Sequence, residues 1–409
     1  MGRRASAWAL LADSVPFYPL YALLFADSGL SESEIAALLA IWSITGVLAE
    51  VPTGVLADRI SRRGSIAAGG VAQALAYVLW SAFPEFGAFA AGFVLWGIGG
   101  TLVSGALEAW LYDALVDLGE PARFQRLYGR ISSCELIAQI PAAIAATVLF
   151  PWGGFALVGW ASVGTCLGAA VLAARLPEPS RRRAGGDGAG DDAGDDPDSG
   201  DGGECRGGDH AAAGGACSGL GATGGYLATL RAGIGEAVRA PAVRRVLVVV
   251  ALLTSVDDIE EFFPLLAENW GVPPQWVPVA TLGIPLAGAC GALLAGRVRP
   301  ARAGPLLLAA TGAFAAAGVW ASPSSLVLVA GFYAVYRGVL VVANARLQEH
   351  IDGTARATVT SVAGVGTDLA GLLLLGAWAL AGLPAALVLT AFVAVLLPWG
   401  LRAAAGTTG

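Results

Sequence analysis

The sequence has no lysine and only two histidines among its 409 residues. Without lysine, the chain has no P-loop lysine to hold nucleotide phosphates, so it cannot hydrolyse ATP by that route. His210 lies in a polar segment and His350 in a loop between apolar stretches, so we expect neither a histidine metal site nor a Ser-His pair within those stretches. We therefore expect no enzyme activity, no metal and no cofactor.

Charge is also scarce. Charged residues make up 13% of the chain against roughly 25% in soluble domains, and 56% of the residues are hydrophobic. This composition predicts an integral membrane protein, in which stretches of about 18 or more apolar residues form transmembrane helices. Twelve such stretches are expected, at residues 5–26, 34–57, 66–84, 87–112, 129–150, 154–176, 246–267, 276–296, 304–321, 325–345, 357–381 and 384–401.

The first stretch follows Arg3 and Arg4, as a signal peptide would, but it is too long for one and has no convincing cleavage site. We interpret it as the first helix. All 24 basic residues are Arg, and all except Arg337 fall in segments that a twelve-helix chain places on one side of the membrane. The positive-inside rule then predicts an all-α protein of the cytoplasmic membrane with both termini cytoplasmic.

One polar segment separates two sets of six stretches. Residues 178–218 are rich in Gly, Ala and Asp and cannot bury enough apolar area to fold. Between Tyr226 and Val238, apolar residues recur every fourth position until Pro241, which predicts a short amphipathic helix on the membrane surface. We therefore predict a six-helix bundle at residues 1–176, a cytoplasmic linker at 177–243 and a second six-helix bundle at 244–409.

The most informative motif joins the second and third stretches. It runs from Gly54 to Gly64 and reads GVLADRISRRG. It resembles the loop between the second and third helices of major facilitator superfamily transporters, whose pattern is Gly, two residues, a small residue, Asp, Arg, two residues, Arg, and Arg or Lys. The resemblance implies two six-helix bundles that move a small molecule by alternating access.

The same resemblance implies a gate at this loop. Asp58 and Arg62 are expected to make contacts between the bundles that hold the outward-open state, and Gly54 to let a neighbouring helix approach closely. Residues 292–299 echo the loop in the second half with Gly296 in place of the Asp, which predicts an asymmetric gate. We assign the remaining charged residues near the cytoplasmic ends of the helices to this gating network: Arg59, Arg63, Glu50, Glu108, Asp113, Arg130 and Glu135.

Within the superfamily, the chain resembles bacterial drug and proton antiporters. It departs from them at two places. Residues 96–100 read WGIGG and lack the Arg and the final Gln-Gly of that group, and residues 140–143 read IPAA without its glycines. Near the second departure, Glu135 and Gln139 lie one turn apart and could reach a central cavity instead of the gate.

The densest ionisable set inside an apolar stretch is Asp257, Asp258, Glu260 and Glu261, in the seventh. At about 1.5 Å per residue, the first two lie roughly 17 Å from the start of the stretch, near the membrane midplane. On an α-helix, Asp257 and Asp258 would each share a face with Glu261. Four carboxylates so close together cannot all stay ionised in a low-dielectric setting, so at least one should hold a proton. The alternative ends the helix at Val256 and leaves the cluster in external solvent.

Arg337 in the tenth stretch and Asp368 in the eleventh are expected at similar depth. Arg337 should pair with Asp368 or with a carboxylate of the seventh stretch, or else contact an anionic substrate directly. Asp13, followed by Pro16 and Pro19, is the corresponding candidate in the first stretch. We assign substrate and proton binding to Asp13, Asp257, Asp258, Glu261, Arg337 and Asp368.

The excess of carboxylates over Arg337 favours protons and organic cations. The leading hypothesis is a monomeric, proton-coupled secondary transporter that expels a small amphipathic, cationic compound. Its partners would be that compound, protons and the lipid bilayer, with no nucleic acid. Two alternatives stay open: an importer of an anion or nutrient anchored by Arg337, and a membrane receptor or scaffold without flux.

Overall fold

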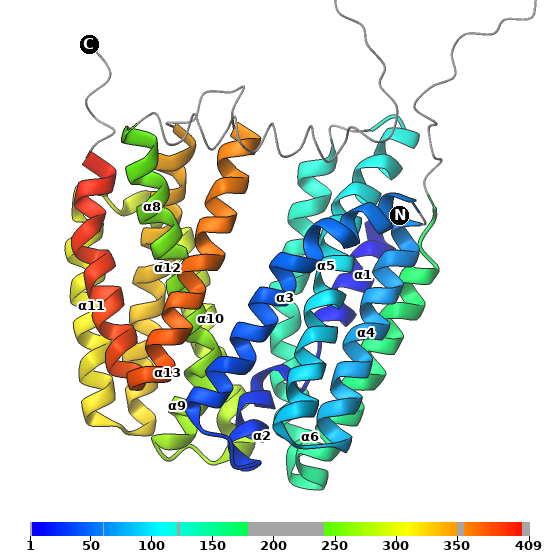
Figure 1. Cartoon of the computed structure of the whole chain (residues 1–409), viewed down its shortest axis with the longest axis horizontal. Coiled ribbons are helices and arrows are strands. Elements are labelled where there is room, and N and C mark those ends of the chain that lie inside the picture. Colours follow the sequence, from blue (N-terminus) through cyan, green and yellow to red (C-terminus); the bar gives the residue numbers. More distant parts are fainter. Residues whose placement is uncertain (1, 60, 121–122, 179–240, 350–355, 403–409) are drawn as a thin grey trace, which may run out of the picture.

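The computed structural model describes residues 2–59, 61–120, 123–178, 241–349 and 356–402, and every regular element in these ranges is helical (Figure 1). The predicted acidic linker and the amphipathic helix at 226–238 lie outside the described residues. We call the elements before residue 178 the N-terminal helix group and those after residue 241 the C-terminal helix group.

The N-terminal helix group contains α1 (Gly2–Asp13), the 3₁₀ helix η1 (Tyr18–Leu20), α2 (Tyr21–Asp27), α3 (Glu32–Arg59), α4 (Arg62–Ala82), α5 (Phe86–Asp117) and α6 (Phe124–Ala174). The C-terminal helix group contains α8 (Pro241–Ser255), η3 (Val256–Phe262), α9 (Phe263–Asn269), η4 (Pro274–Trp276), α10 (Val277–Leu293), η5 (Ala295–Arg297), α11 (Pro300–Trp320), η6 (Pro323–Ser325), α12 (Leu326–Glu349) and α13 (Arg356–Arg402).

Two long helices are divided by kinks. Helix α6 is interrupted at Gly153 and Gly154, and α13 at Ala381 and Gly382. Gly154 and Gly382 have φ values of 57° and 60°, a left-handed conformation that glycine adopts without steric cost. Figure 1 shows the two parts of α13, orange and red, running back alongside each other, so the kink acts as a tight turn.

Nine stretches of the described chain are long and apolar enough to cross a membrane. The stretches 127–174 and 366–400 each contain one of the kinks and so cover two predicted spans apiece. The predicted seventh span is divided among α8, η3 and α9, none of which is long enough alone. The multi-span helical architecture is therefore observed, whereas the count of twelve stays a prediction.

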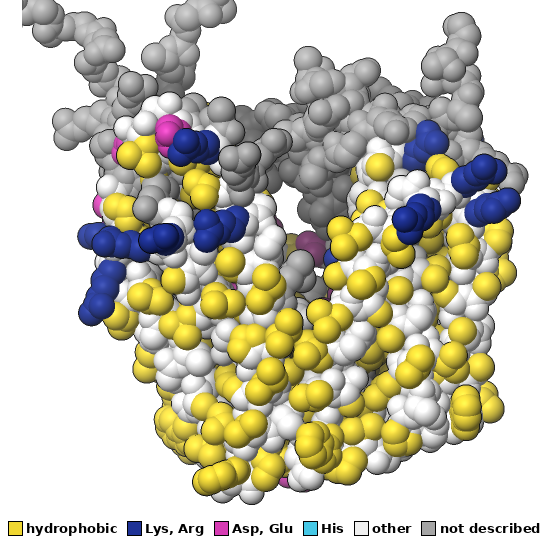
Figure 2. All heavy atoms as spheres, turned by 180° about the vertical axis from the view of Figure 1, so that it is seen from behind, with side chains coloured by type: hydrophobic (Ala, Val, Ile, Leu, Met, Phe, Trp, Pro, Cys, Tyr) yellow, Lys and Arg dark blue, Asp and Glu magenta, His cyan; other side chains and the backbone are white. Residues whose placement is uncertain are grey.

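The helices pack mainly within their own group. Helix α4 contacts α5 and α6 in one group, α8 contacts α13 in the other, and α3–α13 and α6–α10 contacts join the two groups. The groups diverge toward the end that carries most of the arginines, the arginine-rich end, and meet at the opposite end near α2 and α9 (Figure 1). Figure 2 shows a hollow between the groups toward the arginine-rich end, with an acidic side chain visible inside, and hydrophobic side chains over much of the remaining surface.

Aromatic packing makes the opposite end rigid in the N-terminal helix group. The Phe25 ring lies 4.3 Å from that of Phe89 and 5.3 Å from that of Trp80, and all three side chains are buried. The Trp80 indole N–H donates to the Phe89 carbonyl at 3.1 Å, so its one polar atom is satisfied. This cluster holds η1 and α2 in place beside the cavity.

Close packing of α4 on α5 depends on Gly69. An added Cβ there would lie 2.6 Å from the Gly99 carbonyl oxygen and 2.6 Å from Val103 Cγ2. We expect Gly69→Ala to destabilise the fold by about 1–3 kcal/mol, because overpacking must push α4 and α5 apart. The measurement is the thermal unfolding midpoint of detergent-purified protein.

The matched control for this prediction is Gly164→Ala in α6, where an added Cβ meets nothing within 4 Å. It should leave the midpoint unchanged or raise it slightly, since Ala favours a helix over Gly by about 1 kcal/mol. Equal midpoints for the two variants would show that the α4–α5 contact tolerates a methyl group.

Candidate functional site

The carboxylate cluster lies on η3, where the predicted seventh span leaves the α-helical form. Helix α8 ends at Ser255, and the chain continues as a 3₁₀ helix to Phe262 before α9 begins. Pro264 has no N–H to donate to the Glu260 carbonyl as an α-helix would require. The Phe263 N–H binds that carbonyl instead, in the tighter pattern. A 3₁₀ segment between two α-helical parts often marks a functional hinge or a strained sequence.

The 3₁₀ geometry changes which carboxylates share a face. Residues three apart eclipse each other in this form, so Asp257 aligns with Glu260 and Asp258 with Glu261. The expected α-helical pairing of Asp257 with Glu261 is therefore wrong. The structure instead places Asp257 and Glu260 against one tyrosine, Tyr333 of α12.

Arg337 and Tyr333, one turn apart on α12, hold the first pair. Arg337 Nη1 donates to Asp257 Oδ2 at 2.7 Å. The Tyr333 hydroxyl oxygen lies 2.8 Å from Asp257 Oδ1 and 2.6 Å from Glu260 Oε2. Of the two pairings expected for Arg337 within the membrane, the structure shows the one with the seventh span and not the one with Asp368.

Glu261 joins the two helix groups. Its Oε1 lies 3.3 Å from the Tyr18 hydroxyl, and its Oε2 accepts a short hydrogen bond from the Tyr21 hydroxyl. Tyr18 lies on η1, in the break of the first span, and Tyr21 is the first residue of α2 directly after that break. A carboxylate of one group is thus fully occupied by two phenolic donors of the other.

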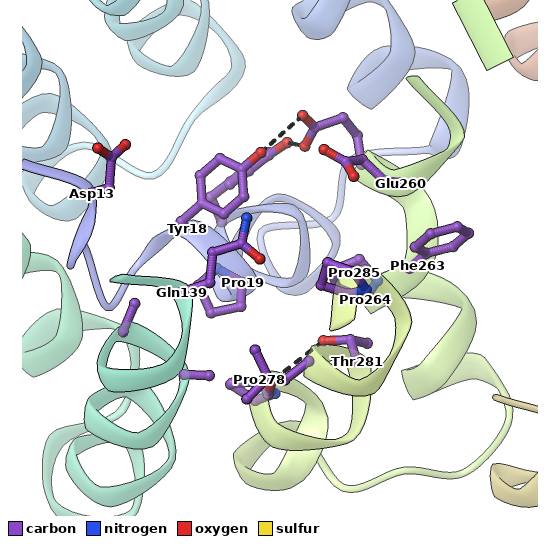
Figure 3. Close-up of a pocket in the computed structure, with 15 residues that line it drawn as sticks. Asp13, Tyr18, Pro19, Gln139, Glu260, Phe263, Pro264, Pro278, Thr281 and Pro285 are labelled. Carbon is purple, nitrogen blue, oxygen red and sulfur yellow. Dashed lines mark hydrogen bonds between the residues drawn. The ribbon is translucent and has the colours of Figure 1, made fainter. Parts of the chain in front are cut away.

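Two cavity lobes flank η3. The first, between α1–α2, α6 and α10, is lined by Asp13, Gln139, Glu260 and Glu261 together with prolines of η1, α9 and α10. Figure 3 shows Asp13 on one side of this lobe and Glu260 on the other, with Tyr18 and Gln139 between them. A neighbouring space of about 480 Å³ extends from Asp13 and Gln139 to Glu135.

The second lobe lies between α3, α5 and α13 and has a volume of about 380 Å³. Its acidic lining residues are Glu50, Asp258, Glu261 and Asp368. Asp258 interacts electrostatically with Glu261 and Asp368, and Asp368 with Glu50. Glu261 lines both lobes, so it is the residue through which the two spaces meet.

The structure therefore brings all six predicted binding residues to one cavity or to the ion pair beside it. Glu50 and Glu135, which we placed in the gate, line the cavity, and Gln139 lines it beside Glu135, as the alternative for that pair expected. The alternative of a carboxylate cluster in external solvent is wrong, because η3 lies between the helix groups and α9 continues beyond it.

Three of the predicted gating residues, Arg62, Arg63 and Asp113, take part in ion pairs within the N-terminal helix group. Arg62 pairs with Asp113 and donates to the Ala109 carbonyl at 2.8 Å. Arg63 Nε lies 2.7 Å from Glu178 Oε2. Arg130 is exposed. The surroundings of Gly54 and the side chains of Asp58, Arg59 and Glu108 lie outside what the structure describes.

A further contact closes the opposite end. The Trp378 indole N–H of α13 donates to Glu32 Oε2 of α3 at 3.1 Å. The Trp378 ring stacks on Phe262 with centroids 4.0 Å apart and planes at 15°. Phe262 directly follows Glu261. The Trp378–Glu32 contact therefore lies next to the contacts of Glu261 with Tyr18 and Tyr21.

Sequence reasoning assigned no role to Tyr18, Tyr21, Glu32 and Trp378, and it left Glu260 out of the binding set. Tyr18 and Tyr21 surround Pro19 in an apolar stretch, a local signal that could have marked them. Trp378 sits in an apolar run without any such mark, and only its tertiary partners reveal its role.

An acidic cavity that lies between two groups of spanning helices, beside interrupted helices, is the arrangement of a secondary transporter. The chain belongs to the Major Facilitator Superfamily, whose family model matches residues 5–375. This membership indicates a multi-pass membrane transporter of small molecules rather than an enzyme.

Solved structures share this fold. The nucleoside transporter NupG aligns with a TM-score of 0.67 at 12% identity, covering 100% of this chain and 99% of its own. The D-xylose-proton symporter gives 0.63 at 13%, covering 97% and 96%. A bacterial homologue of the human lysosomal transporter Spinster, in an inward-facing and occupied conformation, gives 0.65 at 14%, covering 99% and 94%.

A search of curated proteins finds no match. Identities of 12–14% with the solved structures show a common fold and no more. The substrate of this chain must therefore be inferred from its own cavity.

The Asp257–Arg337 pair should contribute measurably to stability. Removing one partner of a fully buried pair costs about 3–5 kcal/mol. Here 36% of the Arg337 side chain and 31% of the Asp257 side chain are exposed, which weakens the interaction between the charges. We expect a coupling energy of about 2 kcal/mol between Asp257→Asn and Arg337→Gln, measured by a double-mutant cycle of unfolding.

The matched control is the surface pair Glu120–Arg123, whose side chains are 41% and 63% exposed. Its coupling energy should stay below about 1 kcal/mol. If both cycles gave the same value, the pair on η3 would contribute no more than an ordinary surface ion pair.

The Glu32–Trp378 contact should hold the opposite end closed. Trp378→Phe removes the N–H donor and keeps a ring to stack on Phe262. Losing this bond to a carboxylate should raise the open population by about fivefold, or about 1 kcal/mol. The measurement is the labelling rate of Leu39→Cys, a buried position on α3, by a membrane-impermeant maleimide in a background without native cysteines.

Trp399→Phe is the matched control, because Trp399 lies under Arg245 near the arginine-rich end with the guanidinium 5.2 Å from its ring centroid. It should leave Leu39→Cys labelling unchanged. Equal labelling rates of Leu39→Cys with and without Trp378→Phe would show that the Glu32–Trp378 contact does not hold the opposite end closed.

Proposed function

We propose that this protein is a proton-coupled secondary transporter that expels a small amphipathic, cationic compound across the cytoplasmic membrane by alternating access. The observation that carries the proposal is the charge of the cavity. Eight carboxylates line or adjoin its lobes: Asp13, Glu50, Glu135, Asp257, Asp258, Glu260, Glu261 and Asp368. Among the described residues beside η3, Arg337 is the one basic side chain, and Asp257 occupies it.

Such a cavity favours a positively charged ligand. Carboxylates at membrane depth are costly when ionised and uncompensated, so protons or a cationic substrate must neutralise most of them. Protons and a cation can replace each other on these groups, which provides the coupling for exchange. Aromatic side chains beside Asp13, namely Tyr18, Tyr77 and Trp96, add surfaces for an amphipathic or cationic group.

Access would alternate between the two ends. In this structure the helix groups meet at the opposite end through Glu261 and Trp378 and diverge toward the arginine-rich end. The proposal takes the arginine-rich end as cytoplasmic, with both termini there, by the positive-inside rule. It includes twelve spans, two bundles at 1–176 and 244–409 joined by the linker at 177–243, and a monomer.

The importer hypothesis has less support. An anion anchored by Arg337 would have to displace Asp257, which lies 2.7 Å away, and enter a cavity lined by further carboxylates. The repulsion of like charges in a low-dielectric site opposes this. The transport experiment below also tests the scaffold hypothesis.

The test uses everted membrane vesicles with an imposed pH gradient. Cationic, neutral and anionic compounds are added in turn, and the dissipation of the gradient is recorded. We expect cationic amphipathic compounds to dissipate the gradient and Asp258→Asn and Asp368→Asn each to abolish the response, since each removes a charge from the second lobe. Glu85→Gln, an exposed site at the start of α5, is the matched control and should behave as the parent protein.

A response confined to anions would support the importer. No flux of protons or solute across the whole panel would support the scaffold. Unchanged transport in both Asp variants would mean that these two residues do not couple proton and substrate.

A further inference from the structure

The hydrogen-bond donors around η3 do not suffice for its carboxyl groups. Asp257 receives Arg337 at one oxygen and lies beside the Tyr333 hydroxyl at the other. Glu261 receives Tyr18 and Tyr21, one at each oxygen. Glu260 has one polar contact in the structure, with the same Tyr333 hydroxyl that serves Asp257.

A phenol carries a single hydrogen. Tyr333 can therefore donate along one of its two contacts, 2.8 Å to Asp257 or 2.6 Å to Glu260. The other contact needs a hydrogen from the carboxyl group. Asp257 is the ionised partner of Arg337, so it accepts the Tyr333 hydrogen, and Glu260 donates to the phenolic oxygen.

We infer that Glu260 carries the coupling proton of this transporter and that Tyr333 is the positioning residue that presents it to the cavity. The inference rests on the proposed function and assigns one part of it to a residue. The 2.6 Å separation lies at the short end of the range for O–H···O hydrogen bonds, as expected for a carboxylic acid donor.

The charges around Glu260 agree with this assignment. On η3 it faces Asp257 and Glu261, and from α12 it faces Arg337, Tyr333 and Tyr336. From η1 it faces Tyr18, while Asp13 of α1 lines the same lobe. The other walls, α6 and α10, present to this lobe Gln139, Thr281 and apolar residues, none of which carries a charge. Arg337 is thus the one cation among these neighbours, and Asp257 already neutralises it.

Glu260 can also exchange its proton with the cavity. Its side chain is only partly buried and lines the first lobe opposite Asp13 (Figure 3). On release, the O–H bond of Glu260 breaks, the proton passes to water in the lobe, and a carboxylate is left. A cationic substrate that enters the lobe compensates the negative charge left on Glu260 when the proton leaves. One proton is thus exchanged for one positive charge on the substrate.

The experiment compares Glu260→Gln with the parent protein in reconstituted vesicles. Gln keeps the shape and cannot release a proton. We expect loss of uphill, pH-driven transport. Substrate exchange at equal pH on both sides should persist with weaker substrate binding, because exchange needs no net proton movement and Asp13 and Glu261 of the same lobe still attract the cation. Glu268→Gln in α9, the same change outside the cavity, should retain both activities.

A second measurement does not depend on knowing the substrate. The infrared carbonyl band of a protonated carboxyl group, recorded on purified protein at neutral pH, should lose one component in Glu260→Gln and none in Glu268→Gln. In Tyr333→Phe that component should change frequency, because the acid loses its acceptor. Tyr336→Phe is the control, since the Tyr336 hydroxyl bonds the Thr254 carbonyl instead.

The two measurements separate the inference from the proposed function. If the parent protein drives no solute, the proposed function fails, and the infrared component alone decides whether Glu260 is protonated. If the parent couples transport to protons and Glu260→Gln does so equally well, or if its infrared spectrum matches the parent, the assignment of the proton to Glu260 is overturned.

Discussion

The architecture depends on one constraint: four carboxyl groups lie on a single 3₁₀ segment of the predicted seventh span, and each must be neutralised or hydrogen-bonded. Left ionised and unpaired, a carboxylate at that depth costs roughly 2.5–3.5 kcal/mol on insertion scales. The surrounding helices supply part of what is needed, through Arg337 and Tyr333 on α12 and through Tyr18 and Tyr21 from the first span. The fold positions donors from both helix groups around η3, and the cavity is what remains between them.

The first and seventh spans solve the same problem in related ways. Each of them is interrupted, with Pro16 and Pro19 at the break between α1 and α2 and Pro264 just after the end of η3, and each interruption frees backbone groups and presents polar side chains. Discontinuous helices at the interface of two repeats are a recurring way to build a transport site. Here the polar side chains at the two breaks bind each other, because the hydroxyls of Tyr18 and Tyr21 bind the Glu261 carboxylate. Whatever changes the charge at η3 therefore acts directly on a contact between the helix groups.

Hydropathy and arginine placement predicted the positions of the helices well, because lipid exposure imposes long apolar runs and loops between them must be polar. Residues 66–84 were expected to span and α4 covers Arg62–Ala82; residues 304–321 were expected and α11 covers Pro300–Trp320. The site was predicted less completely. Its acids were recognisable as charges in apolar runs, but their pairing follows from the 3₁₀ form of η3, and the role of Trp378 from a partner 346 positions away in the sequence. Pro264 is a local signal for the end of the 3₁₀ segment, whereas the contact of Trp378 depends on tertiary packing that no local pattern encodes.

The ion pairs of the charged loop lie at the arginine-rich end, whereas the contacts between the two helix groups lie at the opposite end. Arg62 and Arg63 pair with Asp113 and Glu178 inside the N-terminal helix group, so in this conformation neither of those ion pairs joins the two groups at the arginine-rich end. At the opposite end, Glu261 and Trp378 do join them. A transporter of this fold must exchange one set of contacts for the other, and the free energy for that exchange has to come from ligands that bind the two states unequally. Glu261 is placed for this role, because it lines both lobes and holds both tyrosines. A cation or a proton that takes its charge competes with Tyr18 and Tyr21, and so weakens the closure directly from the binding site.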